Sequence, residues 1–475
     1  MGYPEGTGSR TKTGMGQVVE ALTLEGLTKV AADGRAEPRI ATRWEWSSDG
    51  LTLHVELRPD VLLHDGRPLN SKLAAAILKA IVADQDNHQL FTSLADVTAV
   101  EPDGEFGLAL TVSRHTSYLP EDLSIPFGTQ SDPPVGTGPY HVVQQGESEI
   151  VLDRFDGYYL GRPTIPQVKV RPVETLRSAW TGFLRGDLDM VADLPPDTVE
   201  LVRNDDIQVM SFSRPYQYLV AFNSKHPKFS NPTVRRALNL AVDRESIVNN
   251  VLHGNGTPAT TPIWPKHWAY DPTVELSFDR HEAARLLDWA RLPVRPSTDP
   301  SRPPSRLRFT CILPTGFSIY ERVALELQHQ LFEIGIDVQF EVLPVDVYNR
   351  RTRTGDFEAT FVDMISAPSL GRPYLFWRSA REGRGYNVFG YENPEAEELF
   401  QALRASTTDL SVRSATHRLQ RVFMQDPPAI FLAWNERSRA VRREFGVPVS
   451  DAKTDPLLSL WRWGADKQTE PPIAR

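Results

Sequence analysis

The chain has 475 residues, 40% hydrophobic and 24% charged, which is typical of a globular protein too long for a single hydrophobic core. Its net charge of -9 argues against a nucleic-acid-binding protein, which would normally present a basic face. The lone cysteine, Cys311, excludes an intrachain disulfide and a cysteine-rich metal site, and no apolar run is long enough to predict a membrane-spanning helix.

The first third of the chain predicts two helices and several short strands. Alternate residues from Leu51 to Leu57 are apolar, as on a half-buried strand. Asn70 is placed to cap a helix over about residues 71–83, where apolar residues recur at helical spacing. The other elements predicted here are a helix leading into a strand over 18–30, and strands at 97–100 and 106–112.

The middle of the chain predicts strands, a short helix and one longer helix. The short helix covers 175–185 and ends at Gly186. Asn231 suits a helix cap and Pro232 the first helical position, and apolar residues continue at helical spacing to Leu252. Strands are predicted at 140–143, 149–154, 167–173, 207–212 and 218–222.

The last third alternates strands and helices, which is typical of an α/β unit. A surface loop rich in proline and serine, 295–304, precedes it. The predicted elements are strand 307–313, helix 318–334, strand 337–343, helices 393–406 and 411–424, and closing strands 429–434 and 457–463.

No motif in the sequence predicts catalysis, a metal or a cofactor. His64 and Asp65 are adjacent and would point to opposite faces of a strand, so a turn is the favoured interpretation. The Gly136–Gly138 segment lacks the Lys-Ser/Thr of a nucleotide P-loop and opens no helix. No Gly-x-Ser-x-Gly elbow occurs, and the eleven histidines show no ligand spacing.

Several segments carry a family resemblance through their order along the chain. The segments are Glu25-Gly26-Leu27, Gly136 to Tyr140, Asp153 to Tyr159, Gly186 to Asp189, Phe222 to Ala259, Asp279 to Leu287 and Leu331 to Val338. Together they resemble the extracytoplasmic solute-binding proteins of ABC transporters, in the large-ligand family of oligopeptide-, dipeptide- and nickel-binding proteins. Each segment is a modest match, and their shared order makes the resemblance specific.

The resemblance implies an α/β, two-lobed periplasmic-binding-protein-like (Venus flytrap) fold of the large-ligand type with an extra domain. By analogy, the first lobe is discontinuous and comprises residues 1–40, 131–223 and 437–475. The extra domain, 41–130, is attached to it, and residues 224–436 form the second lobe. A ligand would lie between the lobes, and closure would bury it.

The same resemblance implies ligand-binding residues on two segments of the cleft. Glu25, Leu27 and Thr28 belong to the first segment, and Tyr216 and Tyr218 precede the Phe-Asn pair on the second.

A third segment departs from the family pattern. Peptide-binding members have Trp-x-x-Asp here, whose carboxylate holds the peptide's ammonium group, whereas this chain has Ser366-Ala367 and then Arg372. A buried ammonium group without a counter-charge is costly, so Arg372 would favour an anionic or neutral polar ligand. Asp363 could supply the carboxylate through a register shift. Trp264 is one of several aromatic residues that could wall the cleft, although a single such residue is more often core or rim.

The implied function is that of a non-catalytic receptor that delivers a peptide or other polar small molecule to an ABC permease in the membrane. We expect a monomer without a cofactor or a nucleic-acid partner, in the periplasm or on the outer face of the cytoplasmic membrane. Residues 1–16 lack the apolar core of a signal peptide. The alternative is therefore kept that the chain is the ligand-sensing domain of a cytoplasmic transcriptional regulator; a hydrolase is the least favoured interpretation.

Overall fold

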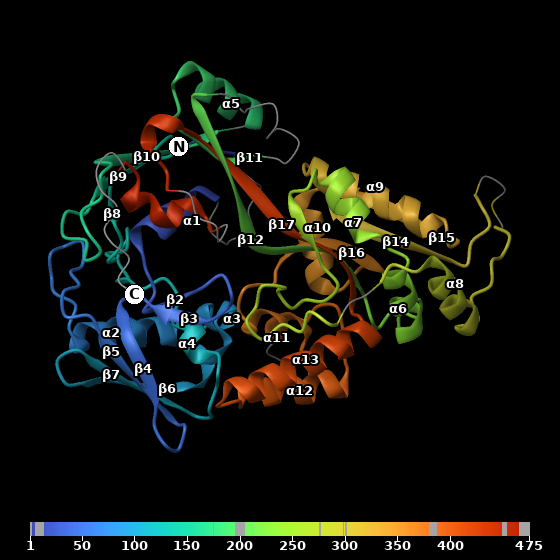
Figure 1. Ribbon diagram of the computed structural model, residues 1–475, viewed down its shortest axis with the longest axis horizontal. Coiled ribbons are helices and arrows are strands. Elements are labelled where there is room, and N and C mark those ends of the chain that lie inside the picture. Colours follow the sequence, from blue (N-terminus) through green and yellow to red (C-terminus); the bar gives the residue numbers. More distant parts are fainter. Residues whose placement is uncertain are drawn as a thin grey trace.

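The computed structural model in Figure 1 has two lobes joined by two long strands, β12 (Ile207–Phe222) and β17 (Ala429–Arg442). The chain passes from the first lobe to the second along β12 and returns along β17. The structure describes residues 2–4, 14–173, 175–194, 205–274, 277–297, 299, 302–379, 387–448 and 454–464.

Within the described ranges, eleven strands form one sheet that runs through both lobes. At its second-lobe end, β14 (Leu307–Pro314) pairs in parallel with β15 (Ile336–Leu343) and β16 (Ala359–Ile365). Parallel neighbours require a crossover, which α9 (Ser318–Phe332) supplies between β14 and β15. Beyond β17 the first-lobe strands are, in order, β11 (Met190–Leu194), β1 (Gly2–Pro4), β10 (Gln167–Val173), β9 (Ile150–Arg154) and β8 (Tyr140–Gln145), while β13 (Gly256–Pro258) pairs with β17.

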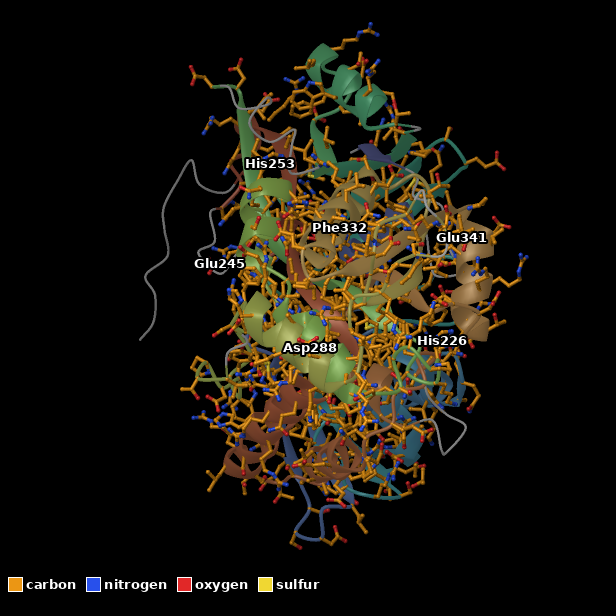
Figure 2. All side chains as sticks on the ribbon, turned by 90° about the vertical axis from the view of Figure 1, so that its right-hand side faces the viewer. His226, Glu245, His253, Asp288, Phe332 and Glu341 are labelled. Atoms are coloured by element: carbon orange, nitrogen blue, oxygen red, sulfur yellow. The ribbon has the colours of Figure 1, made fainter. Side chains whose placement is uncertain are left out.

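Helices cover both faces of the sheet in the second lobe. Along β12, Val220 and Phe222 pack into one hydrophobic cluster and Leu219 and Ala221 into another, because alternate residues point to opposite faces. Figure 2 faces the outer end of this lobe and labels Phe332, which ends α9. The other helices of the lobe are α6 (Pro232–Leu240), α7 (Arg244–Ser246), α8 (Arg280–Trp289), α10 (Val345–Thr354), α11 (Gly371–Trp377), α12 (Pro394–Arg404) and α13 (Asp409–Gln425).

The first lobe packs α1 (Gly14–Thr23) and α5 (Leu176–Arg185) beside its strands. Val18 and Leu22 of α1 share a cluster with Tyr140 of β8 and Val170 of β10. Two 3-10 helices near the end of the described chain, η6 (Arg443–Phe445) and η7 (Pro456–Arg462), complete the lobe.

A separate four-stranded antiparallel sheet forms the extra domain. Leu53, Val55 and Leu57 of its second strand point into the domain core with residues of α2 (Ser71–Ala83). The sheet order is β4 (Ala41–Trp46), β5 (Thr52–Leu57), β7 (Gly107–Val112) and β6 (Val97–Asp103); the hairpin β2 (Thr28–Val30)–β3 (Ala36–Pro38) and the short helices α3 (Asn87–Leu90), η1 (Thr92–Asp96) and α4 (Leu119–Asp122) lie nearby in sequence.

Elements with strong local signals are confirmed. The Asn70 side chain accepts a hydrogen bond from the Leu73 amide at 3.0 Å and begins α2 as predicted. Gly186, with φ of 87°, ends α5 in the left-handed conformation. Asn231 accepts from the Thr233 amide at 2.9 Å and begins α6.

Four predicted elements are wrong in extent or type. The strands 207–212 and 218–222 are one strand, β12. The helix expected from 232 to 252 stops after Leu240, because Asp243 caps a new start by accepting from the Ser246 amide at 2.9 Å; a π-helical turn, Ile247–Val251, follows. The closing strand 457–463 is the 3-10 helix η7, in which Asp455 accepts from the Leu457 amide and Pro456 takes the first helical position.

Candidate functional site

The two crossing strands are irregular where they pass between the lobes. The pairing of β12 with β17 shifts register between Ser213 and Gln217. Pro215 lies within this stretch and has no N–H to donate to a ladder. Its carbonyl instead accepts from the amides of Ser366 and Ala367, at 2.8 and 3.2 Å. An interrupted ladder between two lobes is suited to act as a hinge.

Beside this hinge, three polar side chains of the second lobe converge. Asp363 of β16 lies opposite Tyr218 of β12. The Tyr320 hydroxyl donates to Oδ2 of Asp363 at 3.3 Å, and the Tyr218 ring lies edge-on to the Tyr320 ring, with centroids 5.7 Å apart. Burial and the nearby Asp363 carboxylate raise the pKa of Tyr320. The other carboxylate oxygen of Asp363 is buried and has no hydrogen-bond partner among the described residues.

A small cavity of about 110 Å³ lies at the first-lobe side of the hinge. Arg214 of β12 and Arg437 and Arg439 of β17 line it together with one side of α1, from Gly14 to Ala21. Arg439 is held by Asp455 through two hydrogen bonds of 2.8 and 2.6 Å. The Arg214 guanidinium lies over the Tyr216 ring, 4.3 Å from its centroid.

The lobes touch directly at the β2–β3 turn of the first lobe. The Trp264 indole Nε1 donates to the Ala32 carbonyl, and the Trp268 amide donates to the Asp33 carbonyl, both at 3.0 Å. Arg35 crosses to the second lobe, where it pairs with Asp409 at 2.7 Å and lies over the Trp268 ring. The structure is therefore closed on this side of the hinge.

The extra domain also contacts the second lobe through buried polar groups. Arg404 of α12 forms an ion pair with Asp96, donates to the Tyr374 hydroxyl at 2.9 Å, and accepts at its carbonyl from the Ser117 amide at 2.8 Å. The Ser369 hydroxyl donates to the Glu121 carboxylate. No sequence motif marked Asp96, Arg404 or Glu121, because each has its partner in a distant part of the chain.

The residues predicted on the first cleft segment lie inside the first lobe. Oε1 of Glu25 accepts from the Tyr158 hydroxyl at 2.9 Å and pairs with Arg39, and burial raises its pKa. Leu27 is buried in the core of the extra domain. The Thr28 hydroxyl donates to the Pro120 carbonyl at 2.6 Å. Their polar atoms thus have partners within the first lobe and its extra domain.

The remaining predicted residues are distributed around the hinge and the lobe contact. Tyr218 and Asp363 belong to the group with Tyr320 described above, and Tyr216 lies under the Arg214 guanidinium. Ser366 and Ala367 are buried where their amides meet Pro215. Trp264 packs edge-on against Trp434 as well as contacting Ala32. Arg372 donates to the Leu90 carbonyl at 2.7 Å and lies over the Phe91 ring, so it joins the second lobe to the extra domain.

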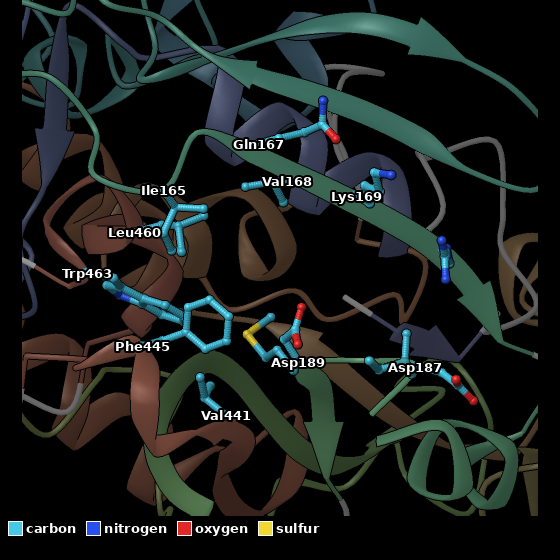
Figure 3. Close-up of a pocket in the computed structure, with 13 residues that line it drawn as sticks. Ile165, Gln167, Val168, Lys169, Asp187, Asp189, Val441, Phe445, Leu460 and Trp463 are labelled. Carbon is cyan, nitrogen blue, oxygen red and sulfur yellow. The ribbon is translucent and has the colours of Figure 1, made fainter. Parts of the chain in front are cut away.

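Two further cavities are present, one between the extra domain and the second lobe and one within the first lobe. A crevice of about 710 Å³ separates the β4–β5 hairpin from the α12–α13 connection and is lined by Trp44, Trp46 and Trp268. A pocket of about 300 Å³ lies between β10, β11 and η7, with Val168 and Trp463 among its walls (Figure 3). Because only first-lobe residues line this pocket, lobe closure cannot bury a ligand in it.

Glu121→Gln is expected to remove a pH dependence of the contact between the extra domain and the second lobe. Burial raises the pKa of the Glu121 carboxyl to about 8, and Asp122 adds to this effect, while Ser369 and Arg372 oppose it. This pKa lies above the ordinary 4.5, so the neutral Glu121 carboxyl stabilises the folded protein. That stabilisation is complete below pH 4.5 and is lost as the pH rises through 8. Burial also raises the pKa of the Asp122 carboxyl, to about 6. The neutral Asp122 therefore stabilises the folded protein in acid as well, and its contribution is lost at a lower pH than that of Glu121.

Thermal melts of the wild type and of Glu121→Gln across this pH range check the expectation. The two proteins should melt together in acid, and the variant should become the more stable as the pH rises through 8. The exposed Glu105→Gln is the matched control. A difference in melting temperature that does not change with pH would contradict the proposed titration.

The described residues show no arrangement for a metal or a membrane span. No three His, Cys, Asp or Glu side chains among them are grouped so as to hold a metal ion. None of the described helices is long and apolar enough to cross a bilayer.

Residues 35–385 match the family model described as bacterial extracellular solute-binding proteins, family 5, middle. The chain is 27% identical to Protein XP55 of Streptomyces lividans over 442 residues, which cover 88% of this chain and 80% of that protein. It is 22% identical to the oligopeptide-binding protein AppA of Bacillus subtilis, over 94% and 86% of the two chains. The structure resembles that of NikZ from Campylobacter jejuni in complex with Ni(L-His), with a TM-score of 0.80 at 20% identity over 97% of this chain and 98% of that one. This likeness confirms the predicted two-lobed α/β fold.

Proposed function

This chain belongs to the bacterial extracellular solute-binding proteins of family 5, and we propose that it binds a polar solute between its two lobes, beside the Asp363 carboxylate. The predicted function, a solute receptor of an ABC importer, is confirmed by the family and by the relatives, which are binding proteins. The alternative of a regulator's sensor domain is not favoured.

The unpartnered oxygen of Asp363 is the observation that carries the proposed site. A buried carboxylate oxygen without a hydrogen bond is costly, so a donor from a bound solute would stabilise it. Tyr218 and Tyr320 add an aromatic surface at the same point. An ammonium, amide or hydroxyl group would suit this wall, which accommodates a peptide or another polar small molecule.

Closure of the lobes would couple solute binding to recognition by a permease. A solute that contacts both lobes binds the closed form better than the open form and shifts the population toward it. The hinge at Ser213–Gln217 allows the lobes to move together. In the closed form Arg35 and Arg404 form ion pairs across the boundary of the second lobe. We infer that an ABC permease reads the closed form.

The remaining assignments are proposals that the family supports. Family 5 binding proteins are extracytoplasmic, and we propose the periplasm or the outer membrane face as the location and a monomer as the acting form. We propose no catalysis and no cofactor. We also propose the lobe bounds 1–40, 131–223 and 437–475, with an extra domain at 41–130 and a second lobe at 224–436; the passage of β12 and β17 between the lobes supports a discontinuous first lobe.

Native mass spectrometry of protein purified without denaturation tests the proposed site. We expect a co-purified solute on the wild type, and at least about a tenfold lower occupancy on Asp363→Asn, which keeps the shape but loses the charge. The exposed Asp346→Asn is the matched control and should retain the solute. Equal occupancy of Asp363→Asn and wild type would refute the site, and release of a covalently altered solute would refute the non-catalytic role.

A further inference from the structure

The first-lobe pocket between β10, β11 and η7 lies in line with the short strand β1. β1 has three residues and pairs in parallel with β10 at residues 171–173 and with β11 at Val191. The pocket is lined by the residues that precede these partners on both sides, 167–169 of β10 and 187–190 before and at the start of β11. Gln167 and Lys169 lie on one side of it and Asp187 and Asp189 on the other (Figure 3). The pocket therefore occupies a place in the sheet that one further strand would fill.

One edge of β10 is without a strand partner along this pocket. Residues 167–170 pair with β9 on one side, and on the other side β1 reaches only residues 171–173. In an antiparallel pair alternate residues direct their N–H and C=O groups to opposite edges, so half of these groups point away from β9. Among the described residues no strand pairs with them there. Such an edge is a template for the amide groups of an extended polypeptide, which a sugar or a lipid does not have.

The side chains on the two sides of the pocket alternate in the same register. Gly2 of β1 lies opposite both Arg171 and Val191, so positions at equal distances before these two residues face each other across the pocket. Buried positions then meet buried ones, and exposed positions meet exposed ones. The facing positions are Val170 and Met190, Lys169 and Asp189, and Val168 and Leu188. This two-residue period is that of a strand, and a strand between the two sides would share it.

The inner wall of the pocket is apolar and its rim is polar. Val441, Leu460 and Trp463 of the first-lobe core line it from below, together with Phe445. The exposed positions at the rim carry charges of both signs, for example Lys169. Inward residues of an added strand would therefore be apolar and its outward residues hydrophilic. A volume of about 300 Å³ suits a segment of a few residues and not a whole domain.

We propose that the first-lobe pocket is the acceptor site for one further β-strand, an extended segment of a partner polypeptide with apolar residues at alternate positions. The strand would pair with the edge of β10 at residues 167–170 and place its apolar side chains between Val168 and Leu188 and between Val170 and Met190. This site goes beyond the proposed function, because only first-lobe residues line it and it is separate from the solute site beside Asp363.

Disulfide trapping of short peptides on the full chain tests the strand site. The single native cysteine, Cys311, is buried, so Lys169→Cys introduces one exposed thiol at the rim of the pocket. The probe is acetyl-Thr-Val-Cys-Val-amide, whose cysteine would lie beside position 169 and whose valines would point inward. The matched peptide acetyl-Thr-Pro-Cys-Pro-amide has the same cysteine but lacks two backbone N–H groups. The exposed Lys72→Cys, on α2 of the extra domain, is the matched protein control.

We expect intact-mass spectrometry to show that Lys169→Cys forms its mixed disulfide with the valine peptide about tenfold faster than with the proline peptide, because only the valine peptide completes the ladder. Lys72→Cys should react with both peptides at equal rates. Hydrogen–deuterium exchange of the backbone amides in residues 167–170 should slow about tenfold once the valine peptide is attached, and should not change with the proline peptide.

Equal rates of the two peptides on Lys169→Cys, or unchanged exchange of residues 167–170 after attachment, overturn the strand site. Disulfide-linked dimers that form faster from Lys169→Cys than from Lys72→Cys would assign the pocket to a second copy of this chain and overturn the partner. The receptor function is judged separately, by the solute found on the wild type and lost from Asp363→Asn.

Discussion

Gly34→Ala is expected to hold the two lobes apart and to lower solute affinity about thirtyfold. Gly34 has a φ of 86° and lies in the β2–β3 turn that touches the second lobe. A Cβ atom there would come within 2.7 Å of the Pro368 carbonyl and 2.3 Å of the His267 ring, both in the second lobe. The backbone carbonyl cannot move aside alone, so the closed contact would cost about 2 kcal/mol.

Gly66→Ala is the matched control for this variant. Gly66 has a similar φ of 83°, but a Cβ atom there meets nothing within 4 Å. The two variants therefore share the backbone strain, and only Gly34→Ala adds the contact between lobes. Small-angle X-ray scattering should report a larger radius of gyration for Gly34→Ala, and native mass spectrometry a lower solute occupancy. If both variants keep the wild-type shape and occupancy, the β2–β3 contact has no part in closure.

Arg244→Met is expected to destabilise the second lobe by about 4 kcal/mol or more. Arg244 is buried and has no carboxylate partner among the described residues; instead its guanidinium donates to backbone carbonyls of Asn239, Val242, Ala259 and Phe431 and to the Asn239 side chain, at 2.7 to 3.1 Å. It thereby satisfies carbonyls at the end of α6 and joins them to β17. Methionine fills a similar volume but leaves these acceptors without a donor.

Denaturant unfolding followed by tryptophan fluorescence measures this loss. Arg244→Lys should be intermediate, since an ammonium group has fewer donors and lacks the planar fork of arginine. Arg236→Met, on the exposed side of α6, should stay within about 0.5 kcal/mol of the wild type. A loss of less than about 1 kcal/mol for Arg244→Met would show that water replaces the guanidinium.

Arg244 also marks a point where the helix predicted from the sequence differs from the helix in the structure. The Asp243-Arg244 pair contributed to the family resemblance, but helical spacing alone predicted one helix through it. In the structure Asp243 begins a new helical segment and Arg244 turns inward. Periodicity detects which positions are apolar, whereas this break involves a polar side chain whose acceptors lie at the end of α6, directly after β13 and in β17.

The predicted site residues also fall into two groups in the structure. The resemblance predicted Tyr216, Tyr218, Asp363 and Arg372 as ligand-binding residues, and this stays a prediction. It also predicted Glu25, Leu27 and Thr28, whose partners in the structure lie within the first lobe and its extra domain. A short motif identifies a strand, but the side of the strand that faces a neighbouring lobe depends on how whole domains pack.

The amino-acid sequence by itself determined the local elements and, through the order of its motifs, the two-lobed fold and the family. Caps such as Asn70 and turns such as Gly186 act within a few residues, so their physics is local. Only the tertiary structure decided where the hinge lies and which charges meet across the lobes. Asp96 and Arg404 are far apart in the chain, and their ion pair depends on positions that hundreds of intervening residues set.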